Sequence, residues 1–568
     1  MHLHICGGTG RGKSTLMRRM IWQDIAAGHG VCVIDPHGTL ISRVMHDMAE
    51  NPPVVGQHWP VSLFEPGQVQ YATGFNPLAG EGDRYATADR LVAATLAAWQ
   101  QFDQAATPRL PRVLMMLFLL LSSRGIPLSD ALLVLQNQKV RKRLLSSSEI
   151  DQGLIDEWLS LGSLQPTQFR DYVDSTSNRL FPFISSSTIR RMFGSTEFGV
   201  DIGAKLEKRS ILLVNLAESR YFTRRSADLV GSLIVNEIVQ HARLRKPDAS
   251  RPFYVYIDEC ARFLNDDVVT ALDETRKFGV HFVLAHQRFA ALLKKGEDIM
   301  DAALDIQNKV VFGGVGAKDL ELLAKVLFMG TIAFDEYIPN TGEAMINGYE
   351  WETTTSRSHS TTTGTSRAEG ESVSEGESAG SSRSKSLSIS HTPAQRQLQG
   401  PNKGEVSVPS SQNYSGSMDF SSSHSHSVEM GRSITETASE SYGESVTYAQ
   451  ALVPQMGESR GARYSLEEQY ERRRAMLKTL PTGKAFVRFG DKDPEYLQVI
   501  PISEPKTEAE YSAYELIYLR YRQEVFERML KSKEAMVSEE VDVLIEERQA
   551  RLRGNPKIVS DDDEDFFQ

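Results

Sequence analysis

A glycine-rich loop, GGTGRGKS, covers residues 7–14 and fits the pattern G-x-x-x-x-G-K-[ST]. An apolar run at residues 2–6 precedes it and a helical pattern follows it, which is the setting in which such a loop binds phosphate. Its glycines let backbone N–H groups close around phosphate oxygens, and the start of the helix adds a favourable partial charge. The expected phosphate-binding residues are Gly7, Gly8, Thr9, Gly10, Arg11, Gly12, Lys13, Ser14 and Thr15.

Two acids end a second apolar run, FYVYIDE, at residues 253–259. Lys13 would reach the β- and γ-phosphates of a nucleotide, and the Ser14 hydroxyl would bind Mg²⁺. Asp258 would hold the same ion directly or through water, and Glu259 would orient or deprotonate the attacking water. An acid pair that only caps a helix is the alternative, and the intact loop favours the catalytic interpretation.

Gln287 ends the next strand pattern, VHFVLAHQ. A polar side chain at this strand tip can touch the γ-phosphate or the water and report hydrolysis, although a structural role is the alternative. His286 is expected to be a packed neighbour. Asp35 ends the run GVCVID, where a role near the catalytic water and capping of the next turn both stay open.

Phosphoryl transfer needs more positive charge than one lysine supplies, and an arginine from a neighbouring subunit often provides it. Arg276, in DETRKFG, is the first candidate and Arg262 is the second. Contact with DNA phosphates, or an ion pair on the surface, is the alternative for both.

The elements that carry these residues alternate between apolar strand patterns and helical patterns. Strand, helix, strand with continuously apolar strands is typical of a parallel α/β sheet. We expect an α/β core in two parts, joined by an all-α insertion and followed by further segments. The expected order is core (1–85), all-α insertion (86–200), core (201–350), Ser/Thr-rich low-complexity insert (351–455), β-hairpin returning to the core (456–505) and helical tail with an acidic C-terminus (506–568).

The low-complexity insert has little to bury, because about a quarter of residues 351–450 are serine. Disorder is the prediction, and a long, polar two-stranded ribbon is the alternative. A single long polar helix is expected at roughly residues 508–552. The acidic end, SDDDEDFFQ, would be a solubilising tail or a docking peptide for a basic partner.

The bulk composition is that of a soluble globular protein with 568 residues and a formal net charge of −11. This sum does not indicate nucleic-acid binding, although it would conceal a local basic channel. The three cysteines lack metal-ligand spacing and are expected to be buried in a reducing cytoplasm. The most apolar run, VLMMLFLLL at residues 113–121, is half the length of a bilayer span and predicts a buried helix.

Several stretches together resemble the HerA/FtsK superfamily, with the type IV secretion coupling proteins of conjugation and their soluble relatives as the nearest likeness. The similarity covers roughly residues 1–340 apart from the helical insertion, and again about 475–502. The stretches are GGTGRGKSTLMRRMIWQDIAAGHGVCVIDPHGTLI, GFNPL, RSILLVNLAESR, LVGSLIVNEI, FYVYIDECARFL, ETRKFGVHFVLAHQ and NKVVFGGVGAKDLELLAKVL.

This resemblance implies a RecA-like P-loop motor that forms hexameric rings and moves DNA through a central pore with ATP and Mg²⁺. Residues 12–14, 258–259 and 287 match the family's phosphate, metal, water and γ-phosphate positions. The helical insertion would match the all-α domain that selects the DNA–protein substrate. A relaxase, a nuclease or a membrane-anchoring secretion subunit would be the partner, and the chain would work in the cytoplasm, at the inner face of the membrane through that partner.

The sequence departs from this family before its phosphate loop. Coupling proteins commonly have membrane helices there and HerA-like proteins have a small barrel, whereas this loop begins at residue 7. We expect either a native start further upstream or a separate anchoring subunit. A structural or regulatory ATP-binding ring that recruits a nuclease or relaxase is the competing hypothesis. A small-molecule kinase is a third, for which the sequence gives no lid or substrate pocket.

Overall fold

The computed structural model describes the backbone and side chains of most of the chain. The ranges are 1–53, 58–79, 83–99, 108–146, 150–208, 210–246, 252–294, 296–329 and 465–554, and between residues 345 and 457 the backbone of six strands is described. The chain divides into two compact units, residues 1–332 with 468–568, and residues 333–467. The first unit holds every residue that the sequence predicts to do chemistry.

A nine-stranded sheet forms the centre of the first unit. Seven neighbouring strands pair in parallel, and a C-terminal hairpin joins β8 in antiparallel fashion. The predicted fold class, a mostly parallel RecA-like P-loop core flanked by helices, is confirmed. The spatial order is β16 (Glu495–Gln498), β15 (Lys484–Arg488), β8 (Asn308–Phe312), β1 (Leu3–Cys6), β7 (Val280–His286), β6 (Phe253–Ile257), β2 (Gly30–Asp35), β5 (Ile211–Asn215) and β3 (Val61–Phe64).

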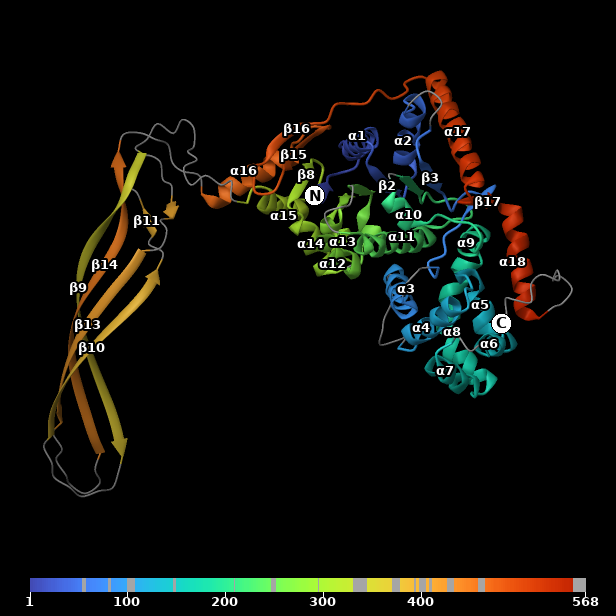
Figure 1. Ribbon diagram of the computed structural model, residues 1–568. Coiled ribbons are helices and arrows are strands. Elements are labelled where there is room, and N and C mark those ends of the chain that lie inside the picture. The colour runs from blue at the N-terminus through green and yellow to red at the C-terminus, as the bar shows by residue number, and fades with distance from the viewer. Residues whose placement is uncertain are drawn as a thin grey trace. The chain divides into compact units, whose positions relative to one another are not determined.

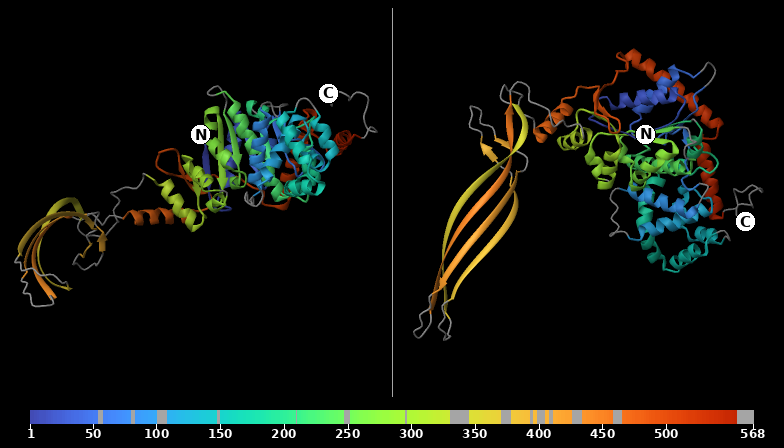
Figure 2. Two further views of the ribbon diagram at one scale, coloured as in Figure 1. Left: turned by 90° about the horizontal axis from the view of Figure 1, so that it is seen from below. Right: turned by 60° about the vertical axis from the view of Figure 1, so that its left-hand side comes forward.

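Helices cover both faces of this sheet, which is why its parallel strands are apolar along their length. Two helices, α1 (Lys13–Ala26) and α2 (Thr39–Glu50), cross the sheet in one direction, whereas α11 (Arg224–Leu244) and α12 (Asp266–Thr275) cross it in the other. Because such crossovers are right-handed, the two pairs lie on opposite faces, as Figures 1 and 2 show. The helices that follow β7 and β8 along the chain are α13 (Phe289–Leu293), α14 (Glu297–Asp305) and α15 (Ala317–Leu327).

Between β4 (Tyr71–Thr73) and β5, the described residues form helices and no strand. The apolar run at residues 113–121 lies in α4, where Val113, Leu117 and Phe118 are fully buried, so the predicted buried helix is confirmed. No helix in the described ranges combines the length and the apolar character that crossing a bilayer requires. The helices are α3 (Arg84–Ala98), α4 (Leu110–Ser123), α5 (Ala131–Gln136), α6 (Gln138–Leu145), α7 (Gln152–Gly162), α8 (Pro166–Ile184), α9 (Ser187–Phe193) and α10 (Ile202–Glu207).

The C-terminal segment differs from the single long helix that the sequence predicts. It consists of α16 (Leu466–Lys478), the β15–β16 hairpin, α17 (Glu508–Lys531), β17 (Ala535–Val537) and α18 (Ser538–Arg553). The expected helix breaks at Lys533, whose φ of 56° is left-handed, and the chain then forms β17, which pairs with β4. A strand partner far away in the sequence overrides the local helical pattern here.

Helices α17 and α18 join the sheet to the all-helical region (Figure 1, red). Phe526 and Met529 of α17 are buried, and the Met529 sulfur accepts a hydrogen bond from the backbone of β3. On α18, Arg548 pairs with the fully buried Asp130 at 2.7 Å. Asp542 also pairs with Arg191, at 2.5 Å. The C-terminal segment is therefore an integral part of the first unit.

The second unit contains four long antiparallel strands within the Ser-rich segment. In spatial order they are β10 (Ser378–Thr392), β13 (Ser411–Ser425), β14 (Ile434–Gly457) and β9 (Met345–Glu369), and a small hairpin pairs β11 (Gln395–Gln397) with β12 (Glu405–Ser407). This backbone resembles the polar ribbon that was the alternative to disorder, but it has four long strands where the ribbon would have two. The choice between disorder and a paired sheet in solution stays a prediction.

Hydrogen exchange of the intact protein tests this choice. If the four strands pair as described, the backbone amides of β13 and β14, the two central strands, will exchange slowly and cooperatively, because each is hydrogen-bonded on both sides. Exchange at the rate of an unstructured peptide throughout residues 411–457 would instead support disorder.

Candidate nucleotide site

The glycine-rich loop runs from the carboxyl end of β1 to the start of α1, as predicted. Gly12 has a φ of 117°, a conformation that side chains rarely adopt. A Cβ atom on Gly7 would lie 2.5 Å from the Cβ of Phe312, and one on Gly8 would lie 2.4 Å from the carbonyl oxygen of Gly314. The loop is therefore packed against the segment that follows β8, and its glycines are required by both space and backbone geometry.

Lys13 places a positive charge inside this loop. Its Nζ donates hydrogen bonds to the carbonyl oxygens of Gly7 at 2.7 Å and Gly8 at 3.3 Å, and the residue is only 6% exposed. Burial lowers the pKa of Lys13, and the nearby Asp258 and Glu259 oppose this shift. The ammonium group thus rests where it can move from backbone oxygens to phosphate oxygens.

The start of α1 is suited to bind an anion. No side chain caps this helix end, and its first turn contains no acid. Ser14 and Thr15 lie in this first turn, and Gly10 precedes it with a left-handed φ of 71°. The carbonyl oxygen of Arg11 accepts a hydrogen bond from Gly483 at 2.9 Å, so the C-terminal hairpin also supports the loop. Free backbone donors at a helix start favour a bound phosphate.

Asp258 and Glu259 follow β6 and lie beside the loop, as predicted. The Asp258 backbone donates to the carbonyl oxygen of Ile34 at 3.0 Å, and its carboxylate is buried. Burial first, and then the charges of Asp35 and Glu259, raise the pKa of Asp258 to about 6. Glu259 adopts a φ of 47° and a ψ of 47°, a left-handed conformation that costs about 1–3 kcal/mol for a non-glycine residue.

Gln287 links the acid pair to the glycine-rich loop. Its amide oxygen accepts a hydrogen bond from the Thr9 hydroxyl at 2.7 Å, and its amide nitrogen donates to the Glu259 carboxylate. The structure therefore brings together one residue from the ends of each of β1, β6 and β7. The sequence predicted Gln287 and Glu259 near the γ-phosphate, but it gave no signal that Thr9 would bind Gln287.

Asp35 caps a helix rather than reaching for a water molecule. Its carboxylate accepts backbone hydrogen bonds from His37 at 2.8 Å, Leu40 at 2.7 Å and Ile41 at 3.1 Å, and it is fully buried. These bonds use both carboxylate oxygens at the start of α2. Of the two roles that the sequence left open, the structure shows the cap.

The two candidate arginines have different surroundings. Arg262 makes a 2.6 Å ion pair with Asp228 on α11, and its side chain is 11% exposed. Arg276 is exposed and precedes β7, so it lies at the amino edge of the sheet, near Met1 and opposite the phosphate loop. Arg276 therefore does not reach the site of its own chain, and its action on the site of a neighbouring subunit stays a prediction.

The site suits Mg²⁺ bound together with phosphate. Among the described residues no group of three or more acids, histidines or cysteines could hold a metal by itself. Mg²⁺ in such sites needs only one or two protein ligands, with phosphate oxygens and waters as the others. The buried Asp258 carboxylate lies near two further acids, and a divalent cation would offset this charge. Ser14 and Asp258 are the residues that would hold it.

A pair of buried histidines lies beneath the site. The Nε2 atoms of His4 on β1 and His286 on β7 are 2.6 Å apart, and the rings stack with centroids at 4.8 Å. Burial lowers the pKa of His286 to about 4, while burial and the neighbouring His286 hold the pKa of His4 well below its usual value. His286 is thus a packed neighbour, as predicted, and both rings are neutral at pH 7.

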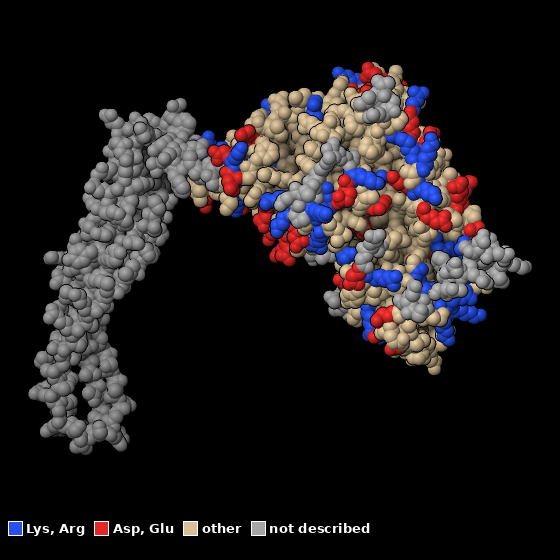
Figure 3. All heavy atoms as spheres, viewed as in Figure 1, with Lys and Arg blue, Asp and Glu red and all other residues tan. Residues whose placement is uncertain are grey.

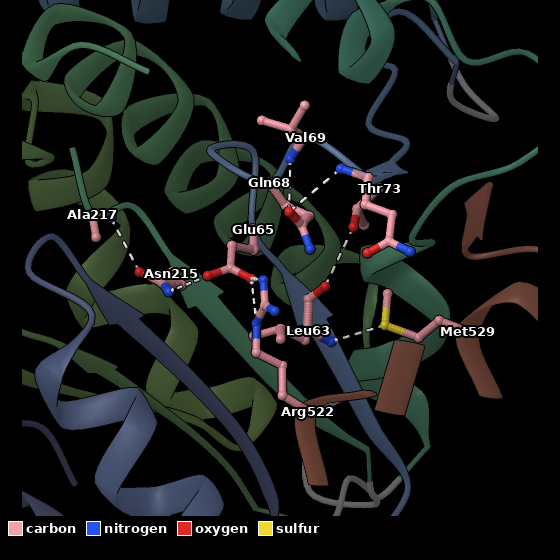
Figure 4. A network of polar contacts seen from close by, with 10 residues as sticks. Leu63, Glu65, Gln68, Val69, Thr73, Asn215, Ala217, Arg522 and Met529 are labelled. Atoms are coloured by element: carbon pink, nitrogen blue, oxygen red, sulfur yellow. Dashed lines mark hydrogen bonds and ion pairs between the residues drawn. The ribbon is translucent and has the colours of Figure 1, made fainter. Parts of the chain in front are cut away.

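A second polar cluster lies at the same edge of the sheet, at the ends of β5 and β3, which are two and three strands from β6 (Figure 4). The Glu65 carboxylate accepts hydrogen bonds from Asn215 at 2.7 Å and from Arg522 of α17 at 2.9 and 2.5 Å. Glu65 and Asn215 stand at strand ends, as Asp35 does, but neither was predicted from the sequence. Arg522 has no such signal, because it lies 457 residues from Glu65.

The comparison with family models confirms the resemblance to the HerA/FtsK superfamily at the start of the chain. The model described as "Helicase HerA, central domain" matches residues 1–42, which hold β1, the phosphate loop, α1 and β2. No curated protein matches this sequence.

Solved structures with a similar course of the chain share 12–14% sequence identity with it. An unbound form of the bacterial conjugative coupling protein TrwB aligns at 13% identity over 89% of this chain and 87% of its own, with a TM-score of 0.46. TrwB in complex with ADP and Mg²⁺ aligns at 14% over 90% and 87%, also at 0.46. VirB4 of Thermoanaerobacter pseudethanolicus aligns at 12% over 58% and 81%, at 0.34.

The histidine pair predicts that acid weakens the fold. Between pH 6.5 and about 4 the unfolded chain binds a proton at His286 that the folded chain does not, so stability is lost as the pH falls. From pH 7 to pH 5, the free energy of unfolding should fall by about 2 kcal/mol more in the wild type than in His286→Gln. Urea unfolding at both pH values measures this difference. The raised pKa of Asp258 has the opposite effect on stability, but it is present in both proteins and cancels in the comparison. Equal pH dependence of the free energy of unfolding in the two proteins would contradict the lowered pKa of His286.

Proposed function

We propose that this chain is an ATPase that hydrolyses ATP at the edge of its parallel sheet. The observation that carries the proposal is the convergence of Lys13, the acid pair 258–259 and Gln287 around one uncapped helix start. These groups come from three strands, and each matches a requirement of phosphoryl transfer. A loop that only bound phosphate would not need two acids and an amide opposite its lysine.

The residues divide the work by their chemistry. Lys13 and the backbone N–H groups of residues 9–13 bind and orient the phosphates, which shortens the approach of the attacking water. Ser14 and Asp258 would hold Mg²⁺, which would offset the charge of the transferring phosphoryl group. Glu259 accepts the proton of the attacking water, and Gln287 contacts the γ-phosphate. Partial burial keeps other water away from these groups.

We further propose that the ATPase forms a ring, a hexamer by its family resemblance, and moves DNA. In such a ring Arg276, which lies exposed at the amino edge of the sheet, would reach the phosphate of a neighbouring subunit. Figure 3 shows Lys and Arg side chains gathered where α6 and the end of α18 lie. The exposed basic residues of these two helices include Lys139, Lys142 and Arg553. Such a basic group supports contact with DNA phosphates despite the negative net charge.

The role that follows is the coupling or pumping ATPase of a conjugative or mobile-element type IV secretion-like system. It would work in the cytoplasm, with a relaxase as the partner and with a secretion subunit that holds it at the inner face of the membrane. The match of residues 1–42 to a helicase of the HerA kind favours a second candidate. In that role the ring serves as a regulatory or structural partner of a nuclease in DNA processing or phage defence.

Two variants test the hydrolytic site. Lys13→Ala and Glu259→Gln should each lower DNA-stimulated ATP hydrolysis by about 10²-fold or more, since one removes phosphate binding and the other removes the base. Arg520→Met, an exposed change on α17, is the matched control and should hydrolyse ATP like the wild type. A purified wild-type hexamer that hydrolyses no ATP, with or without DNA, would sink the proposal.

The same variants separate the two candidate roles. If the chain moves DNA, both variants lose biological function. If it is a regulatory ring that needs ATP only to assemble, Glu259→Gln keeps biological function and Lys13→Ala loses it.

A further inference from the structure

Three residues form a hydrogen-bonded chain across the mouth of the nucleotide site, and we name it the Thr9–Gln287–Glu259 chain. The Thr9 hydroxyl donates to the Gln287 amide oxygen at 2.7 Å, and the Gln287 amide nitrogen donates to a Glu259 carboxylate oxygen. Thr9 is exposed, whereas Gln287 and Glu259 are half-buried. The chain spans the loops that follow three neighbouring strands of the sheet.

We infer that Thr9 is a positioning residue that acts through Gln287 to hold Glu259 in a resting state until a γ-phosphate enters the site. This inference rests on the proposed ATPase function and deepens it, because it names what keeps the base from acting before the substrate is complete.

The two different ends of a glutamine amide give the Thr9–Gln287–Glu259 chain of hydrogen bonds a fixed direction. An amide has an acceptor end and a donor end. The Glu259 carboxylate can only accept, so the N–H groups of Gln287 face it, and the amide oxygen at the opposite end accepts from the Thr9 hydroxyl. A carboxylate that accepts this bond is held in one orientation, turned toward Gln287.

Glu259 is held from its backbone as well as from its side chain. Its backbone N–H donates to the Asp258 carboxylate at 3.0 Å, and its left-handed conformation places the side chain toward Gln287. A residue in a sparsely populated backbone conformation persists only where its surroundings hold it. The Thr9–Gln287–Glu259 chain supplies one of these restraints.

A γ-phosphate would compete with Glu259 for the same donor. Phosphate oxygens accept hydrogen bonds and repel the amide oxygen of Gln287, so a bound γ-phosphate draws the Gln287 N–H groups away and frees the carboxylate. ADP has no γ-phosphate and leaves the chain intact. Binding of the triphosphate therefore carries the cost of breaking the contact between Thr9 and Gln287, and binding of the diphosphate does not.

This difference predicts how Thr9 variants bind nucleotides. In Thr9→Val the cost disappears, so the affinity for the β,γ-imido analogue of ATP should rise by about two- to tenfold relative to the affinity for ADP. Thr9→Ser keeps the hydroxyl and should match the wild type. Titration calorimetry with Mg²⁺ measures both affinities, and a midpoint of thermal unfolding equal to that of the wild type shows that Thr9→Val is folded.

A double-mutant cycle shows whether Thr9 acts through Gln287. In a Gln287→Ala background the Thr9→Val change should leave the ratio of the two affinities unchanged, because the hydrogen bonds of the Thr9–Gln287–Glu259 chain are already lost. A ratio that rises as much in that background as in the wild type would overturn the inference. A Thr9→Val ratio that stays the same or falls would also overturn it, since the hydroxyl would then have no role or would grip the γ-phosphate itself. Failure of the wild type to bind either nucleotide would instead refute the proposed ATPase.

Discussion

The charge of Lys13 is the feature on which the rest of the site depends. Its ammonium group is buried at the carboxyl edge of a parallel sheet, beside Glu259 and beside Asp258, whose charged form burial also disfavours. Neither sign of charge would be stable there alone, and their proximity together with hydrogen bonds to backbone oxygens makes the arrangement tolerable. The two carboxylates outnumber the one ammonium group, and a divalent cation would offset the remaining negative charge.

The sheet and the helices that cover it hold these charged groups in place. Close packing of Gly7 against Phe312 fixes the loop, and the buried Asp35 carboxylate fixes the start of α2 beside it. Away from the nucleotide, Arg522 binds Glu65 at the same edge of the sheet, and α18 binds the all-helical region through Arg548. The C-terminal helices thus contact both the sheet and the all-helical region of the first unit.

Local signals were enough to predict the core of the site. A strand, a glycine-rich loop and a helix start identify Lys13, and a polar residue after an apolar run identifies Asp258, Glu259 and Gln287, because parallel strands end at a common edge. The buried helix at residues 113–121 also follows from its composition alone. These features depend on residues that are close in the sequence or on a repeated strand pattern.

Features that depend on distant partners escaped the sequence. The helix expected at 508–552 breaks because β17 pairs with β4, more than 450 residues earlier. Arg262 is committed to Asp228, and nothing in its local sequence reveals that partner. The left-handed backbone of Glu259 and its link to Thr9 through Gln287 likewise arise only when three strand ends meet.

The central claim is that one site is completed by residues some 250 positions apart, and the Mg²⁺ dependence of nucleotide binding in Asp258→Asn tests it most directly. If Asp258 holds the metal for a nucleotide bound at Lys13, Mg²⁺ will raise the ATP affinity of the wild type, and this gain will shrink by about tenfold or more in the variant. ATP affinity without Mg²⁺ should be kept or improved, because a negative charge near the phosphates is gone. An undiminished Mg²⁺ gain in Asp258→Asn would show that the two segments do not form one site.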